Sequence, residues 1–101
     1  MKRDQVLTWL EARRPAPPPA LARHLAACVG QGPEPLAGHL ASIGSELLRR
    51  VAANPGAGRE LALDLLAADA FVTYAFEAQA DADPASLAAL AGRVEGELSA
   101  A

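Results

Sequence analysis

Apolar residues recur along most of this chain at the three- and four-residue spacing that is typical of amphipathic helices. Breaks rich in proline and glycine separate the periodic segments. The segments cover residues 4–14, 20–29, 35–53, about 58–79, and a last one that starts near 83. The pattern predicts an all-α fold, a small helical bundle of four to five helices in which the segment of about 58–79 is a long central helix.

The breaks also predict how the helices connect. Residues 15–19, PAPPP, form a proline-rich connector that is stiff and extended, because proline interrupts a helix. The NPGAG turn at residues 54–58 is short, so the third and fourth helices are expected to run antiparallel. Asp83 suits the N-cap of the fifth helix, with Pro84 as its first residue. We expect residues 1–101 to form a single helical domain.

The central helix carries two apolar faces instead of one. At 100° per residue, one face holds Leu61, Leu65, Ala68, Val72 and Phe76, and the other holds Leu63, Leu66, Ala67, Ala70 and Tyr74. Two narrow polar seams separate these faces. The first contains Glu60 and Asp64, with Phe71 nearby, and the second contains Asp69 and Thr73. A helix of this kind is expected to be contacted from two sides. The candidate interaction face for a partner is Leu61, Leu65, Val72 and Phe76.

The apolar run from Leu61 to Phe76 raises the question of a membrane span. A helix needs about 20 apolar residues to cross the bilayer core. This run is shorter and contains Asp64 and Asp69, and a carboxylate at the bilayer centre is unfavourable. The pattern therefore does not predict a membrane-spanning helix.

Composition supports the all-α prediction and hints at origin. Of the 101 residues, 25 are alanine, the best helix former, and β-branched residues are scarce. Abundant Ala, Gly, Pro and Arg is typical of proteins from GC-rich bacteria. Cys28 is the only cysteine, so no internal disulfide can form. No apolar segment follows the basic start at Met1–Arg3, so a cytoplasmic location is expected.

Charge is unevenly distributed along the chain. Residues 1–30 carry a net charge of +3 and residues 54–101 a net charge of −6, within a total of −3. The basic segment could meet an acidic partner, but it more simply packs beside the acidic half of its own chain or of a second copy. A nucleic-acid binder usually shows a basic stripe with aromatic or polar readers. Neither is visible, so no nucleic-acid partner is expected.

The central aspartates are candidates for chemistry. Asp64 and Asp69 point about 140° apart on one helix, so they cannot form a close carboxylate pair by themselves. We expect them to pair with arginines across the bundle or with a neighbouring hydroxyl such as that of Thr73. A ligand pocket near the central helix would be lined by Asp69, Tyr74 and His39.

Metal and nucleophile motifs are incomplete. His24 and Cys28, four residues apart on one helix, provide only half of a zinc site. A nucleophile would need Cys28 with a histidine, or His39 with Ser42 or Ser45, and no flanking motif supports either. No metal site and no cofactor are therefore predicted.

These patterns leave two functional classes open. The first is a non-catalytic helical module for protein–protein interaction, which associates with itself as a homodimer or with another protein. The second is a small-ligand-binding or enzymatic helical domain with a pocket near the central helix.

Overall fold

The computed structural model describes residues 1–56 and 58–99, and in these residues the chain is all-α. The elements are α1 (Arg3–Glu11), α2 (Pro19–Cys28), α3 (Leu36–Ala53), α4 (Arg59–Ala82), the 3-10 turn η1 (Pro84–Ser86) and α5 (Leu87–Ser99). The predicted fold class, a small bundle with a long central helix, is confirmed. Within the described residues, no helix is both long and apolar enough to cross a membrane.

Helix boundaries differ from the predicted ones by a few residues. α4 continues to Ala82, three residues beyond the predicted end, because the amide of Asp83 still bonds the carbonyl of Gln79 at 2.8 Å. Asp83 itself is extended, as the residue before a proline must be. Its carboxylate accepts from the amide of Ala85 at 3.2 Å, so it caps the 3-10 turn η1, whereas the sequence predicted a cap on the fifth helix itself. α5 starts only at Leu87, because the first turn after Pro84 is 3-10 instead of α-helical.

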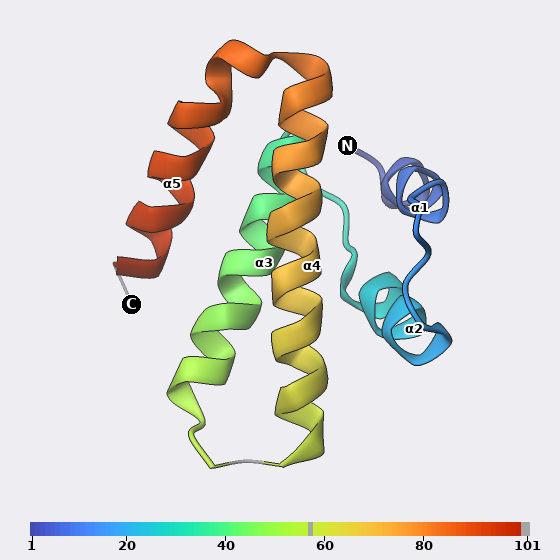
Figure 1. Cartoon of the computed structure of the whole chain (residues 1–101), viewed down its shortest axis with the longest axis vertical. Coiled ribbons are helices and arrows are strands. Elements are labelled where there is room, and N and C mark those ends of the chain that lie inside the picture. The colour runs from blue at the N-terminus through green and yellow to red at the C-terminus, as the bar shows by residue number, and fades with distance from the viewer. Residues whose placement is uncertain (57, 100–101) are drawn as a thin grey trace.

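α4 occupies the centre of the bundle (Figure 1). α3 and α4 form the antiparallel hairpin expected from the short turn between them. α5 returns beside α3 on one side of the hairpin, while α1 and α2 lie on the other side and are seen nearly end-on. The central helix therefore receives contacts from two sides within its own chain.

Small side chains let α3 and α4 approach closely. Ala41 and Gly44 on α3 and Ala68 and Ala75 on α4 are all buried. A Cβ atom at Gly44 would lie 2.8 Å from Val72 Cγ2 and 3.3 Å from the carbonyl oxygen of Ala68. Phe71 is fully buried and is the largest side chain in the core. The hairpin thus packs one bulky ring among alanines and a glycine.

The two polar seams of α4 differ in burial. Asp64 and Phe71 lie on the most buried line of the helix, with Asp64 only 8% exposed. Asp69 and Thr73 face solvent. The sequence pattern placed both seams between two apolar faces, and the structure buries the first seam and exposes the second. One seam is the core-facing line, and the two apolar faces flank it and are each only partly covered.

The N-terminal segment is held mainly by hydrogen bonds to the backbone. The Arg3 guanidinium donates to the carbonyls of Val29, at 3.0 Å, and Ala26, at 3.0 Å. The terminal amine of Met1 donates to the carbonyl of Gly32. The basic and acidic parts of the chain meet at an ion pair between Arg13 and Glu77 on α4, at 2.7 Å. Most basic groups of the first segment do not use an acidic partner.

Candidate functional site

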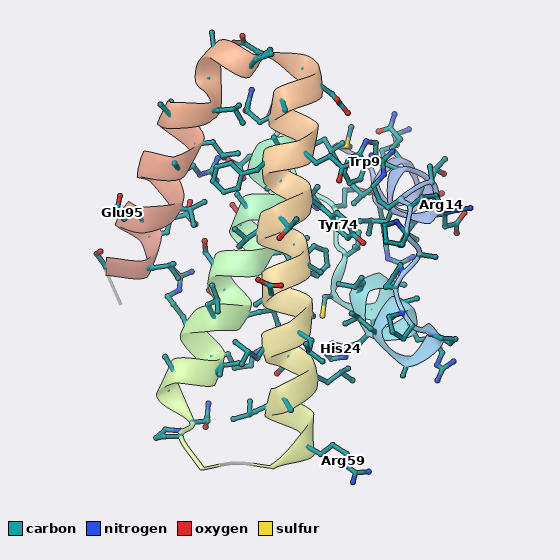
Figure 2. All side chains as sticks on the ribbon, viewed as in Figure 1. Trp9, Arg14, His24, Arg59, Tyr74 and Glu95 are labelled. Atoms are coloured by element: carbon teal, nitrogen blue, oxygen red, sulfur yellow. The ribbon has the colours of Figure 1, made fainter. Side chains whose placement is uncertain are left out.

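The three residues predicted to line a ligand pocket do not converge. Asp69 is exposed on the outer side of α4. Tyr74 packs its ring edge against Trp9, with ring centroids 5.9 Å apart (Figure 2). His39 is 8% exposed and lies under the loop before α3, where a Cβ at Gly32 would be 3.2 Å from His39 Nδ1. The predicted set of Asp69, Tyr74 and His39 is therefore not a single site.

His39 lies opposite the apolar stripe of α3 in the sequence pattern, and the structure nevertheless buries it. Its Nε2 atom has no hydrogen-bond partner among the described residues, and the same is true of Ser45 Oγ. His39 and Ser42 share α3, but Ser42 donates to Glu34 instead. No nucleophile–base pair is formed by His39 with Ser42 or Ser45 in the described part of the chain.

Three helices bring charged groups together around Asp64. His24 on α2 lies with Nε2 2.7 Å from Asp64 Oδ1, and Arg50 on α3 has NH1 3.9 Å from Asp64 Oδ2. The predicted arginine contact across the bundle is thus accompanied by a closer histidine contact. The sequence pattern did not predict the contact between His24 and Asp64, because the two residues lie on different helices that are far apart in the chain. The cluster joins α2 to the hairpin.

Cys28 stands beside this cluster but is not activated by it. Burial raises the pKa of the Cys28 thiol, the nearby Asp64 carboxylate raises it further, and Arg50 opposes both. A nucleophilic cysteine needs the reverse shift, because the thiolate is the reactive form. Among residues 1–56 and 58–99, no three His, Cys, Asp or Glu side chains are placed to share a metal ion. His24 and Cys28 therefore read as a packing and pairing feature.

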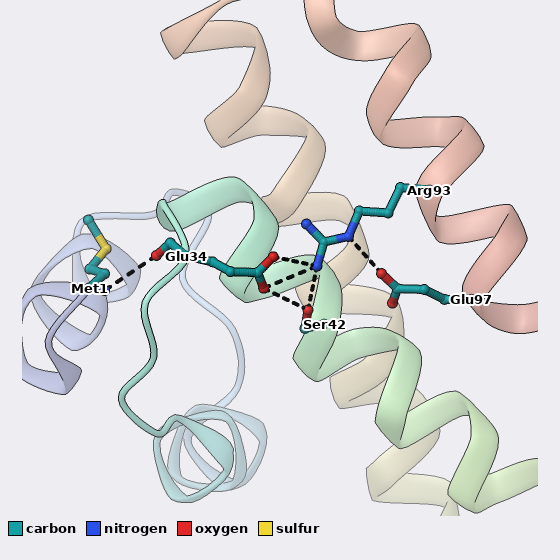
Figure 3. Close-up of polar contacts among 5 residues, drawn as sticks. All are labelled: Met1, Glu34, Ser42, Arg93 and Glu97. Carbon is teal, nitrogen blue, oxygen red and sulfur yellow. Dashed lines mark hydrogen bonds and ion pairs between the residues drawn. The ribbon is translucent and has the colours of Figure 1, made fainter.

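A second polar network lies between α3 and α5 (Figure 3). Arg93 NH2 lies 2.7 Å from Glu34 Oε1 and 2.7 Å from Ser42 Oγ, while Arg93 Nε lies 2.7 Å from Glu97 Oε1. Burial raises the pKa of Glu97, but the hydrogen bond from Arg93 and the neighbouring positive charges outweigh it, so the net pKa is below the usual value. Met1 extends the network through its terminal amine, 3.3 Å from the carbonyl of Glu34. Each charged member has a partner, so the network fixes α5 and offers no free group for chemistry.

An apolar cleft of about 350 Å³ opens between α1, α2 and α4. Its lining is Leu7, Leu10, Glu11, Arg13, Ala16, Pro17, Ala22, Arg23, Leu25, Ala26 and Tyr74. Arg13 is held in place, since its guanidinium stacks 3.8 Å above the Trp9 ring and pairs with Glu77. Of the three predicted ligand residues, Tyr74 borders this cleft, and the cleft is largely hydrophobic.

The outer face of α4 is the other open feature. We define the outer face as Ala62, Leu65, Leu66, Asp69 and Thr73, which are all exposed. Leu65 is 48% exposed and Leu66 is 56% exposed. Of the predicted interaction face of Leu61, Leu65, Val72 and Phe76, only Leu65 is exposed, and the other three are half-buried. Leu66 was missed because the helical wheel placed it on the opposite apolar face.

Comparison with protein-family models, with curated proteins and with solved structures finds no match for this chain. Functional inference therefore rests on the arrangement of its own residues.

Proposed function

We propose that this protein is a non-catalytic helical module that associates with a second copy of itself through the outer face of α4. The observation that carries the proposal is the exposure of Leu65 and Leu66, two consecutive leucines in the N-terminal third of a long helix. Leucine loses about 2 kcal/mol of favourable burial energy when it is left in water. An adjacent pair on one helix is more typical of a contact surface than of scattered surface leucines.

The chemistry of the rest of the outer face supports helix–helix contact. Ala62 and Thr73 are small, so a second helix could approach closely, much as α3 approaches α4 at Gly44. The two polar clusters, around Asp64 and around Arg93, are internally paired, and neither presents a catalytic arrangement among the described residues. A nucleic-acid partner is not part of the proposal, because the chain is acidic overall. The bacterial origin that we propose for the protein follows from its composition. The cytoplasmic location that we propose follows from the sequence after Met1–Arg3, where no apolar segment begins.

The proposal predicts a concentration-dependent dimer that is lost when charge is placed on the outer face. We expect light scattering or sedimentation to give twice the mass of the chain at tens of micromolar. The Leu65→Glu/Leu66→Glu double variant should be a folded monomer, because four like charges would be buried in the dimer. Leu98→Glu, at an exposed leucine on α5, is the matched control and should remain dimeric.

Two results would contradict the proposal. The first is a wild-type chain that stays monomeric throughout this concentration range. The second is a double variant that still dimerises, since the contact surface would then lie elsewhere. Circular dichroism of the double variant must match the wild type, so that loss of the dimer is not loss of the fold.

The apolar cleft favours a second candidate function, the binding of a small amphiphilic ligand. Its size, about 350 Å³, and its mostly apolar lining are typical of ligand pockets. Arg23 borders the cleft, is exposed, and could meet a carboxylate at the mouth. An aliphatic carboxylate is therefore the ligand class that fits this cleft.

Titration with decanoate tests the second candidate. Trp9, the only tryptophan, packs against Tyr74 in the cleft wall, so its emission should shift and saturate as decanoate binds. Ala26→Phe, which fills the cleft, should abolish the shift in emission. Ala88→Phe, at an exposed position of α5 away from the cleft, should leave the shift unchanged. An unsaturated response, or the same response in the filled variant, would exclude this site.

A further inference from the structure

Two opposite charges flank the exposed leucines of the outer face. Arg59, the first residue of α4, projects away from the body of the protein (Figure 2). Asp69 lies on the other side of the leucine pair along the same helix. Neither forms an ion pair or a side-chain hydrogen bond with any side chain that the structure describes. Along α4, a positive charge at Arg59 is therefore followed by the apolar pair of the outer face and then by the negative charge of Asp69.

Such an order is self-complementary only in one orientation. Two copies that are related by a two-fold axis present the same surface to each other. If the axis passes between Leu65 and Leu66, the two leucine pairs meet at the centre of the contact. The helices then run antiparallel, and Ala62 of each copy lies opposite Asp69 of the other. Arg59 of each copy lies about 4.5 Å from Ala62 along the helix axis, at a rise of 1.5 Å per residue. An arginine side chain can span this distance to Asp69 of the other copy.

A parallel arrangement would lack this complementarity. It would place Arg59 beside Arg59 and Asp69 beside Asp69 of the second copy, and like charges in contact are unfavourable. The helix dipoles also favour the antiparallel pairing, because the positive N-terminal end of each helix then lies near Asp69 of the other.

The antiparallel pairing is also compatible with the contacts within each copy. With this axis, the overlap of the two α4 helices ends near Thr73, so the C-terminal part of each α4 extends past the start of the other α4. Glu77 lies in that part and keeps its ion pair with Arg13. The contact would therefore leave the packing of α1 against α4 unchanged.

We infer that two copies of this chain pair through antiparallel α4 helices, with Leu65 and Leu66 at the two-fold axis and Arg59 of each copy against Asp69 of the other. This inference rests on the proposed self-association and adds its partner orientation and its charge specificity. The leucines supply most of the affinity, and the two ion pairs select the orientation.

Charge reversal at the two positions tests the pairing. We expect Arg59→Asp and Asp69→Arg to weaken the dimer about tenfold each, because two attractive pairs become two repulsive ones. The Arg59→Asp/Asp69→Arg double variant should return to within about threefold of the wild-type dissociation constant, because the pairs are restored with reversed sign. Both changes suit the monomer: an aspartate is favourable at a helix N-terminus, and arginine is a good helix former at an exposed position. Raising the salt concentration should bring the dissociation constants of the wild type, the two single variants and the double variant closer together.

Disulfide trapping tests the orientation independently of charge. In a Cys28→Ser background, an equimolar mixture of Ala62→Cys and Asp69→Cys chains should form mainly the mixed disulfide under mild oxidation, because these positions face each other across the axis. Ala62→Cys alone should cross-link poorly. A parallel dimer would give the opposite result, with each cysteine variant linking to itself.

The outcomes separate the two proposals. A wild-type chain that never dimerises overturns both self-association and this pairing. A dimer that is lost in Leu65→Glu/Leu66→Glu but is indifferent to charge reversal, or that forms no mixed disulfide, overturns only the antiparallel pairing.

Discussion

Replacing Phe71 by alanine is expected to lower the free energy of unfolding by about 3–5 kcal/mol, the usual loss for a buried phenylalanine. Phe71 is completely buried and is the largest side chain of the core. The buried residues of α4 in the same core cluster are otherwise alanines, which have no flexible atoms that could move into the space left by the ring. The cavity should therefore remain largely open, which places the loss toward the upper end of this range.

Chemical denaturation followed by circular dichroism measures this loss. A chain of this size has a total stability of about 5–15 kcal/mol, so Phe71→Ala could leave a substantial fraction unfolded. Phe71→Leu keeps most of the volume and should lose no more than about 1.5 kcal/mol, which keeps the test informative if the alanine variant does not fold. Phe76→Ala, at a half-buried position on the same helix, is the matched control and should lose clearly less. Equal losses at the two positions would show that Phe71 is not the centre of the core.

Replacing Gly44 by leucine is expected to destabilise the protein by about 1–3 kcal/mol, and by more if α3 and α4 must separate. The first side-chain carbon would already lie 2.8 Å from Val72 Cγ2 and 3.3 Å from both Phe71 Cβ and the backbone oxygen of Ala68. A backbone oxygen and a Cβ atom cannot move without moving α4 itself. The remaining leucine carbons would then have no space at this helix crossing.

Alanine substitutions at two glycines separate this steric effect from helix propensity. Both Gly44 and Gly92 lie inside helices, where alanine is favoured over glycine by about 1 kcal/mol. A Cβ at Gly92 would meet no atom within 4 Å, so Gly92→Ala should stabilise the protein by up to that amount. Gly44→Ala should instead be destabilising, because the Val72 methyl group must yield. Thermal unfolding shows directly whether each variant is more or less stable than the wild type. A gain of stability in Gly44→Ala would disprove the close approach of α3 and α4.

The pattern of residues was sufficient for the helices and their connections. Proline and glycine act locally on backbone conformation, so the breaks at 15–19 and 54–58 could be located from neighbouring residues alone. Asp83 before Pro84 determined a helix junction for the same reason. Boundaries were less accurate, as at Ala82, because the last turn of a helix depends on hydrogen bonds that the following residues make or lose.

The candidate site was less predictable. The sequence pattern placed Asp64 and Asp69 in two polar seams of the central helix and proposed that Asp69, Tyr74 and His39 line one pocket. The structure buries Asp64 against His24, leaves Asp69 in solvent, and covers His39 with the loop that contains Gly32. Helical periodicity reports which side chains share a face, but it does not report which face another segment will cover.

The sequence by itself determined that this chain is all-α, that its third and fourth helices form an antiparallel hairpin, and that the fourth helix is contacted from two sides. These properties follow from backbone preferences and from the spacing of apolar residues, and both act over a few neighbours. Only the tertiary structure decided which polar seam of α4 became its buried line and that Leu65 and Leu66 stay exposed beside Arg59 and Asp69. The physical reason is that burial depends on residues far apart in the chain, since α2, α3 and α5 pack against α4 and no described segment covers its outer face.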